Sequence, residues 1–313
     1  MKRTLGLVAT IMALLLGLSG CGSNGASGGE TGSGKITVQD SHGEVSLDKV
    51  PERIVVMDFG ALDTLKALGM GDRVVGIPQG GTVPPHLEEF AGEGVENVGS
   101  PKEPDMEAIN RAKPDLVVVG GRQADFYEDI NKVFPTLDVS YDKGMDAIEA
   151  TEYQADLLGQ ATGTSEVADQ KVEAMKDDAE KKEDVLEDQT ALVVMTTGGK
   201  VSLHGEESRF GLVHSLLGAE PAVENISTDK HGQPASFEAL AKADPDIMFV
   251  VDRDSVVSGG GENAEVLLDN DLVNGTKAAK NDKMVYLDAS RWYLTATGLE
   301  NVPAMLDQAS SVA

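Results

Sequence analysis

Apolar residues along the chain fall into short continuous runs rather than into a strict alternation with polar residues. Runs of this kind are typical of strands that are buried on both faces of a parallel sheet. A helix is expected before two of the runs, over residues 106–111 and 237–242, and each helix ends ahead of a proline that cannot continue it. The chain is therefore predicted to be an α/β protein. The runs lie at residues 54–57, 116–119, 191–195 and 247–251.

Part of this pattern occurs twice. Residues 106–122 recur as residues 237–253 without a gap, and each copy consists of a short helix, a Pro-Asp pair, an apolar run and a final arginine. The arginines, Arg122 and Arg253, come just past the predicted strands, at the edge where open α/β sheets bind their ligands. An arginine at a strand end is also common as a surface residue paired with an acidic neighbour, and Asp254 is such a neighbour of Arg253.

A second correspondence precedes each copy, since a strand, a Phe-Gly pair and a helix ending in Leu-Gly occur over residues 54–69 and again over residues 191–218. We therefore expect two similar α/β lobes with a ligand cleft between them, an N-terminal lobe over residues 36–163 and a C-terminal lobe over residues 188–313. Some enzymes use the same architecture, so it does not decide the function.

The lobes are expected to be joined by one long rigid helix over residues 164–187. Residues 165–187 contain no Gly or Pro, and their apolar positions recur at intervals of 3, 4 or 7 residues among charged ones. This spacing predicts an amphipathic helix of about 23 residues, about 34 Å long. A surface helix of one lobe is the alternative, but the location at the midpoint of the duplication favours a connection. The apolar positions are Ala168, Val172, Met175, Ala179 and Leu186.

Residues 1–20 are predicted to be a lipoprotein signal peptide. Lys2 and Arg3 precede an apolar stretch of about 14 residues, whereas a membrane span needs about 20. The chain's single cysteine, Cys21, ends a Leu-Ser-Gly-Cys sequence that resembles a bacterial lipobox, whose cysteine carries the lipid. An ordinary secretory leader with a chance cysteine is the alternative. The Gly- and Ser-rich residues 21–35 are predicted to form a flexible tether.

Charge and composition exclude several functions. The formal net charge of −27 argues against a nucleic-acid partner, because phosphate binding needs clustered Lys and Arg. A single cysteine cannot form an internal disulfide or a cysteine-based zinc site. From residue 36 onward the sequence contains no GxSxG, P-loop or HExxH motif, and the five histidines of the chain lack ligand spacing, which disfavours an enzyme and a free-metal binder. The glycine-rich stretch at 258–261 is followed by Glu262, which would repel phosphate.

Several short motifs resemble one known family in their order and spacing. Four short stretches precede the long helix and the second copy. They are Val-Pro-Glu-Arg-Ile-Val-Val at 50–56, Ala-Leu-Gly at 67–69, Arg-Val-Val-Gly at 73–76 and Lys-Pro-Asp-Leu-Val at 113–117. This arrangement resembles the solute-binding proteins of iron-chelate ABC importers, which have two lobes joined by a single helix. The resemblance covers about residues 36–310 and implies a lipoprotein that delivers a ferric siderophore to a permease.

Within that family the chain is most similar to the members that bind catecholate siderophores, the petrobactin-binding proteins above all. The similarity lies in Gly-Gly-Arg-Gln at 120–123, Ser-Arg-Phe-Gly at 208–211 and Val-Asp-Arg at 251–253. It implies three ligand-binding arginines, which are Arg122, Arg209 and Arg253. Guanidinium groups suit an anionic chelate because arginine stays charged, is weakly hydrated and offers its donors in a planar fork.

The resemblance also implies that His231 and Tyr293 lie in the pocket, where they would ligate a siderophore iron that keeps open coordination sites. Trp292 is the alternative pocket aromatic, in which case Tyr293 belongs to the core. Lys200, in the turn after the strand over residues 191–195, is predicted at the rim of the site.

The expected partners are a ferric siderophore, ABC permease subunits and, through lipidated Cys21, the extracellular face of the cell membrane. Glu107 and Glu238 are equivalent residues of the two copies, and the resemblance implies that they dock on the permease. The helix dipole alone also favours an acidic residue in a first helical turn. A monomer without an intrinsic cofactor is expected.

Haem- or cobalamin-binding proteins of the same transporter class are the alternatives. Haem needs an axial ligand and an apolar slot, and three arginines exceed what its two propionates require. Cobalamin would need an aromatic-lined cleft, whereas aromatic residues make up 4% of the chain.

Overall fold

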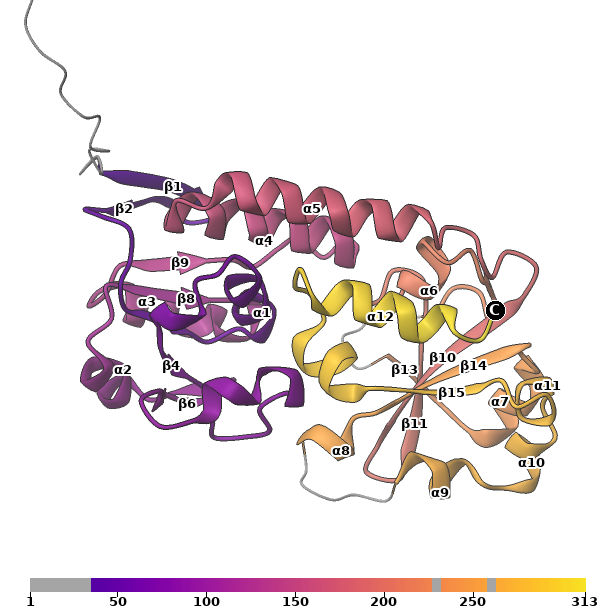
Figure 1. The fold of residues 1–313 in the computed structure, drawn as a ribbon. Coiled ribbons are helices and arrows are strands. Elements are labelled where there is room, and N and C mark those ends of the chain that lie inside the picture. Colours follow the sequence, from indigo (N-terminus) through magenta and orange to yellow (C-terminus); the bar gives the residue numbers. More distant parts are fainter. Residues whose placement is uncertain (1–34, 227–231, 258–262) are drawn as a thin grey trace, which may run out of the picture. The chain divides into compact units, whose positions relative to one another are not determined.

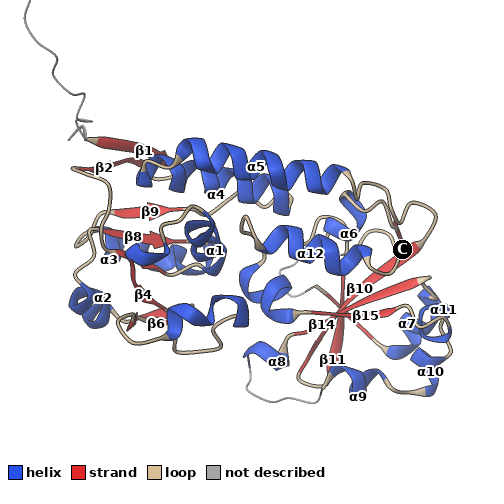
Figure 2. Cartoon of the chain, viewed as in Figure 1, coloured by secondary structure: helices blue, strands red, loops and turns tan. Residues whose placement is uncertain are grey.

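The structure is a computed structural model, and it describes residues 35–226, 232–257 and 263–313. These residues form two α/β lobes. Figure 1 shows the N-terminal lobe in indigo to magenta and most of the C-terminal lobe in orange to yellow. Helices lie around the strands of each lobe (Figure 2), which confirms the predicted fold class. Among the described residues, no helix is long and apolar enough to cross a membrane.

The N-terminal lobe is built on a fully parallel, five-stranded sheet in the order β5-β4-β3-β8-β9. Strand β8 (Leu116–Val119) lies where the apolar run predicts it, and all four of its residues are buried, as expected when helices cover both faces. The other strands of this sheet are β3 (Ile54–Val56), β4 (Val74–Ile77), β5 (Glu96–Asn97) and β9 (Thr136–Asp138). Two small hairpins pair β1 (Ile36–Asp40) with β2 (Gly43–Leu47) and β6 (Gly99–Ser100) with β7 (Glu103–Pro104). The helices are α1 (Phe59–Ala67), α2 (Met106–Ala112), α3 (Tyr127–Asn131), α4 (Ala147–Thr162) and the 3-10 helices η1 (Gly71–Arg73), η2 (Pro85–Ala91) and η3 (Gly121–Phe126).

The C-terminal lobe contains a mixed sheet in the order β13-β11-β10-β14-β15, with β12 paired to β10. The central strands β10 (Thr190–Thr197) and β14 (Ile247–Asp252) are parallel and cover the two apolar runs predicted here. The remaining strands are β11 (Lys200–His204), β12 (Glu220–Pro221), β13 (Gln233–Ala235) and β15 (Met284–Leu287). The helices are α6 (Leu212–Ser215), α7 (Phe237–Ala243), α8 (Asp254–Val257), α9 (Ala264–Leu268), α10 (Asp271–Asn274), α11 (Lys277–Lys280), the π-helix η4 (Ser290–Thr295) and α12 (Asn301–Ser310).

The duplication read from the sequence extends to the backbone. Helices α2 and α7 both end at a residue in the left-handed conformation, Lys113 with φ 48° and Asp244 with φ 43°, immediately before the equivalent prolines. The aspartates that follow those prolines also act alike, since Asp115 accepts the backbone N–H of Arg53 at 2.8 Å and Asp246 accepts that of Thr190 at 3.0 Å. Each Pro-Asp pair thus fastens the start of one strand to the start of its parallel neighbour.

The predicted connecting helix is shorter than expected. Helix α5 (Ser165–Glu180) has 16 residues and buries four of the five predicted apolar positions, but it ends before Leu186. Residues 181–188 form turns instead, because the backbone N–H groups of Asp184 and Leu186 bond to the carbonyls of Leu216 and Leu217. Leu186 is therefore buried, but not as part of the helix. In Figure 1, α5 runs alongside α4 from the N-terminal lobe toward the C-terminal lobe, so it is packed on its neighbours along its length.

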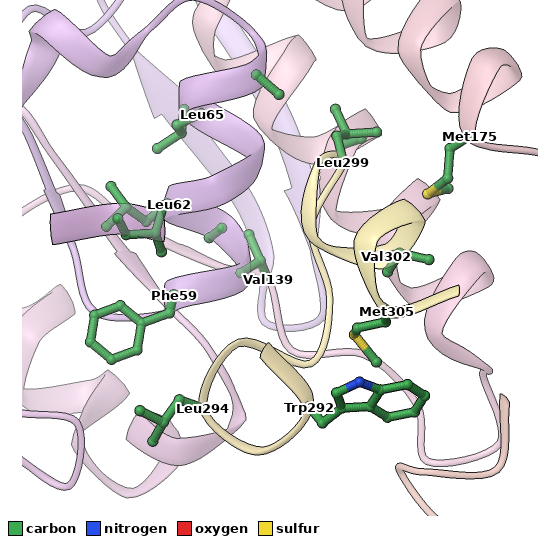
Figure 3. Packing of buried hydrophobic residues seen from close by; sticks show 14 of the residues in the cluster. Phe59, Leu62, Leu65, Val139, Met175, Trp292, Leu294, Leu299, Val302 and Met305 are labelled. Carbon is green, nitrogen blue, oxygen red and sulfur yellow. The ribbon is translucent and has the colours of Figure 1, made fainter. Parts of the chain in front are cut away.

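A hydrophobic cluster crosses from one lobe to the other. It contains Phe59 and Leu62 of α1, Met175 of α5, and Trp292 and Met305 from the C-terminal segment. Figure 3 shows these side chains together with others of the cluster. The C-terminal segment therefore provides a second connection between the lobes, in addition to α5.

Asp63 of α1 holds the start of helix α12 across this junction. Its Oδ1 accepts the backbone N–H groups of Glu300 at 2.8 Å and Asn301 at 3.2 Å, so a carboxylate from the N-terminal lobe caps a helix of the other lobe. Gly298 permits this approach, since its φ is 113° and a Cβ atom there would lie 2.4 Å from Asp63 Oδ1. The Asp63 side chain is 1% exposed, and burial raises its pKa to about 6 despite the two N–H donors.

We expect the free energy of unfolding of the wild-type protein to depend on pH through Asp63, and a comparison with the Asp63→Asn variant to reveal that dependence. A raised carboxyl pKa means that the folded chain favours the proton, so this stabilisation is present below pH about 4 and is lost as the pH rises through about 6. Relative to Asp63→Asn, which resembles the protonated carboxyl, the wild-type free energy of unfolding should fall by about 2 kcal/mol between pH 4 and pH 7. Urea denaturation of both proteins measures the difference.

His86 also titrates in this pH range and lies beside Asp63, with its Nε2 atom 4.0 Å from Asp63 Oδ2. Burial lowers the pKa of His86 to about 4, which makes stability rise with pH, but above about pH 5 folded His86 is neutral in both proteins and its contribution cancels in the difference. A stability difference between wild type and Asp63→Asn that does not change with pH would show that Asp63 keeps an ordinary pKa.

Candidate functional site

Tyr293 stands at the centre of the candidate site, and the π-helix η4 places it there. In this helix Trp292 points into the core and is fully buried, whereas Tyr293 is half-buried. The Trp292 indole N–H donates to Gln308 Oε1 at 3.0 Å, which fixes the ring on helix α12. Ala296 closes the turn with a positive φ of 63°. A π-helix is a wide, uncommon turn that often occurs at functional sites.

Three arginines surround Tyr293. Their guanidinium carbons lie 5.5 Å (Arg122), 5.1 Å (Arg209) and 5.5 Å (Arg253) from the centre of the tyrosine ring. Arg122 donates to the Tyr293 carbonyl oxygen at 2.6 Å, and Arg209 donates to the same oxygen at 3.3 Å. Arg253 Nε donates to the Tyr293 hydroxyl at 2.9 Å. The structure thus brings the three arginines named from the sequence together around one residue, and both lobes contribute.

Local structure fixes two of these arginines at sheet edges. Arg122 follows β8 in the 3-10 helix η3, whose first turn is held by the buried side chain of Gln123, which accepts the Gly120 N–H at 3.0 Å. Arg253 follows β14, its backbone N–H bonds to the Thr196 carbonyl, and its guanidinium donates to the Thr197 hydroxyl at 2.8 Å. Both therefore lie at the carboxyl ends of parallel strands, where ligands of such sheets bind.

Arg209 follows strand β11 and is the most exposed of the three. The preceding residue, Ser208, accepts the Gly211 N–H through its carbonyl and the Phe210 N–H through its hydroxyl, which makes a tight turn. The Arg209 guanidinium lies 5.9 Å from the centre of the buried Phe210 ring as well as above Tyr293. Two aromatic rings therefore hold this side chain in place.

The positive charge of the cluster is only partly neutralised. Among the described residues, one carboxylate lies within 4.0 Å of these arginines: Asp254, at 3.9 Å from Arg253. Burial and the neighbouring charge of Arg209 lower the pKa of Arg122, although Asp58 partly opposes them. Burial alone would raise the pKa of Tyr293, but the hydrogen bond from Arg253 and the three guanidinium charges together lower it below its usual value. Like charges held this close together favour an anionic ligand.

Two further residues belong to the site and were missed in the sequence. Asp58 lies two residues past the end of β3, and Tyr141 lies three residues past the end of β9. Asp58 Oδ2 faces the backbone of Gly120, two residues before Arg122. Burial raises the pKa of both Asp58 and Tyr141, and the charges of Arg122 and Arg209 oppose that shift, so both residues lie within electrostatic range of the cluster. The sequence does show that Asp58 is a polar residue immediately after the apolar run at 54–57. That position indicates a site residue only once the strand order shows that β3, β8 and β9 are neighbours.

Of the other predicted site residues, Trp292 lies outside the pocket. Trp292 is a core residue, because its ring is 0% exposed and packs in the cluster that joins the lobes (Figure 3), so the predicted role in the pocket was wrong. Lys200 begins β11 opposite Thr197, the threonine that Arg253 contacts, and its side chain is exposed. His231 lies outside the residues that the structure describes.

The predicted docking residues are accessible on both lobes. Glu107 and Glu238 each occupy the first turn of a short helix, α2 and α7 respectively, and both are exposed. In the described part of the chain, no group of three or more His, Cys, Asp and Glu residues could hold a metal ion. The three arginines around Tyr293 offer positive charge and hydrogen-bond donors to an anion.

Comparison with known proteins agrees with this architecture. The sequence pattern of the periplasmic binding protein family matches residues 54–290. The petrobactin-binding protein YclQ of Bacillus subtilis is 33% identical over 98% of this chain and 97% of its own length. The ferric-anguibactin-binding protein FatB of Vibrio anguillarum is 31% identical over 98% of this chain and 97% of its own length.

Solved structures are similar as well. The crystal structure of YclQ superposes with a TM-score of 0.85 at 32% identity, covering 89% of this chain and 98% of that one. The catecholate-siderophore-binding protein VctP of Vibrio cholerae gives a TM-score of 0.81 at 29% identity, covering 88% of this chain and 99% of that one. These matches confirm the predicted family and a binding protein rather than an enzyme. The chain belongs to the periplasmic binding protein family.

Proposed function

We propose that this chain is the extracellular binding component of an ABC importer and captures a ferric siderophore of the catecholate type. The observation that carries the proposal is the convergence of Arg122, Arg209 and Arg253, from both lobes, on Tyr293. Relatives whose names state petrobactin, anguibactin and catecholate siderophores as ligands support the same ligand class.

The chemistry of a catecholate chelate matches the cluster. Three catecholate dianions around Fe³⁺ give a net charge of about −3, and guanidinium groups bind such oxygen-rich anions through short, charge-assisted hydrogen bonds. The planar guanidinium also stacks on aromatic rings, as Arg209 does on Phe210 and Tyr293. A local positive site is needed because the whole chain carries a net charge of −27, which repels anions at long range.

Tyr293 has a second role in this proposal. Its lowered pKa favours the phenolate, and a phenolate oxygen is a good ligand for Fe³⁺. Tyr293 would fill an open coordination site of an incompletely wrapped iron, together with His231. A siderophore that fills all coordination sites of the iron would instead be bound by the arginines alone.

Delivery to the permease uses the two lobes together. Exposed Glu107 and Glu238 occupy equivalent places on them, so the pair would dock on basic pockets of the permease subunits. The lipidated Cys21 would keep the loaded protein at the outer face of the cell membrane. The chain would act as a monomer and need no cofactor of its own.

Fluorescence of Trp292 tests the ligand class directly. This residue is the only tryptophan in the chain and is adjacent to Tyr293, so a ferric chelate in the site should quench it. We expect ferric petrobactin or another ferric catecholate to quench at submicromolar concentration, and ferric citrate, a ferric hydroxamate, haem and cobalamin to bind more weakly. Submicromolar quenching by haem or cobalamin alone would overturn the proposal.

A further inference from the structure

Asp58 is a carboxylate in the site to which the proposed ligand contacts assign no role. It caps helix α1, since its Oδ1 accepts the Ala61 N–H at 3.0 Å. Its other oxygen, Oδ2, faces the backbone of Gly120 at the end of β8, where a Cβ atom would lie 2.6 Å from it. The carboxylate is thus wedged between the ends of β3 and β8, at the strand edge that carries Arg122.

The charged groups that face Asp58 come from three other segments. Arg122 of η3 and Arg209 after β11 stabilise its ionised form, and Tyr141 after β9 is the neighbouring titratable hydroxyl. Neither arginine forms an ion pair with Asp58 within 4.0 Å among the described residues, so the attraction acts at longer range. Burial outweighs these charges and the helix N–H groups and raises the pKa of Asp58.

A trianionic ligand would change this balance. With Asp58 and Asp254 ionised, two carboxylates offset part of the charge that the three arginines present to the ligand. Ligand negative charge placed beside Arg122 would also cancel the attraction that favours ionised Asp58 and would add direct repulsion. Burial already favours the neutral carboxyl, so protonating Asp58 costs less free energy than keeping it ionised beside the bound anion.

We infer that Asp58 takes up a proton from solvent when the ferric siderophore binds, so that capture strengthens as the pH falls. The proton goes to Oδ2, because Oδ1 is occupied by the N–H of Ala61. This inference rests on the proposed function, since it requires an anionic ligand among the arginines. It makes the site sensitive to the acidity of its surroundings through one carboxyl.

Asp58→Asn isolates this effect because asparagine caps helices as well as aspartate and resembles the protonated carboxyl. We expect the variant to bind ferric petrobactin about three- to tenfold more tightly than wild type at pH 7.5. The ratio of the two dissociation constants should approach one as the pH falls to 5. Protonation of the siderophore itself affects both proteins equally and cancels in that ratio.

Three results would count against the inference, and they are distinguishable. If both proteins bind ferric petrobactin with a ratio that does not change with pH, Asp58 takes up no proton. If Asp58→Asn binds more weakly at every pH, the carboxylate supports the arginines instead. If neither protein binds ferric petrobactin or another ferric catecholate, the proposed function itself fails.

A second measurement avoids the substitution altogether. The Asp58 carboxyl carbon of the wild-type chain can be followed by NMR titration, free and with the gallium(III) complex of petrobactin, which is diamagnetic. We expect its apparent pKa to rise on ligand binding. An unchanged value in the complex would overturn the inference even if Asp58→Asn does not fold.

Discussion

Arg122→Ala should weaken the binding of ferric petrobactin about a hundredfold, or about 2.7 kcal/mol. Arg122 is less exposed than Arg209, and its guanidinium connects η3 of one lobe to the Tyr293 carbonyl of the other. The variant therefore loses a charge that faces the ligand and a hydrogen bond that positions Tyr293. Losing one partner of a desolvated, hydrogen-bonded charge pair commonly costs this much affinity. Fluorescence titration of Trp292 provides the dissociation constant.

Matched variants separate charge from geometry in that experiment. Arg122→Lys keeps the charge but loses the planar fork, so an intermediate loss is expected. Arg209→Ala should cost about tenfold, because that side chain is more exposed and its charge is better screened. Arg111→Ala removes an exposed arginine that is paired with Glu96, and affinity should not change. An Arg122→Ala protein within about threefold of wild type would remove Arg122 from the site.

The strands were the most predictable part of the fold. A strand covered on both faces must be apolar throughout, so the run at Leu116–Val119 marks β8 to the residue, and the run at 247–251 marks all but the last residue of β14. The short helices expected at 106–111 and 237–242 form as α2 and α7, whereas two other helices depended on tertiary contacts. The helix expected between Phe210 and Leu217 is the single turn α6, because the chain folds back so tightly before it that a Cβ at Gly211 would lie 1.8 Å from the Glu206 carbonyl oxygen.

The end of α5 shows the same limit. Residues 181–187 continue a helical pattern and contain no breaker, yet the carbonyls of Leu216 and Leu217 capture the backbone N–H groups of Asp184 and Leu186. A contact between segments about 30 residues apart leaves no local signal, and tertiary contacts of this kind routinely override helix propensity.

The site was predictable where the sequence repeats itself. Arg122 and Arg253 were found because the duplication places both at strand ends, and Arg209 came from the family resemblance. Asp58 and Tyr141 were missed because only the order of strands β3, β8 and β9 brings their loops to one edge of the sheet. The choice between Trp292 and Tyr293 needed the π-helix, whose irregular turn sends adjacent aromatic residues to opposite environments.

Replacing the buried Trp292 is the second change for which we expect a large effect, in this case on the stability of the fold. Trp292→Ala should lower the free energy of unfolding by about 3–5 kcal/mol, because a fully buried ring leaves a cavity that the core refills only in part. The ring belongs to the cluster that contains α1 of the N-terminal lobe, so the junction between lobes should loosen as well. Urea denaturation followed by circular dichroism measures the change, since the variant has no tryptophan fluorescence.

Trp292→Phe is the control, because it keeps an aromatic ring and loses mainly the indole N–H bond to Gln308. Its cost should be about 1–2 kcal/mol, since the Gln308 oxygen keeps the Asp288 N–H as a donor. Because Trp292 anchors the turn that carries Tyr293, affinity for ferric petrobactin should decrease more in Trp292→Ala than in Trp292→Phe under conditions where both are folded. Isothermal titration calorimetry tests this order. Equal affinities would mean that the arginines, rather than the core beneath them, hold Tyr293 in place.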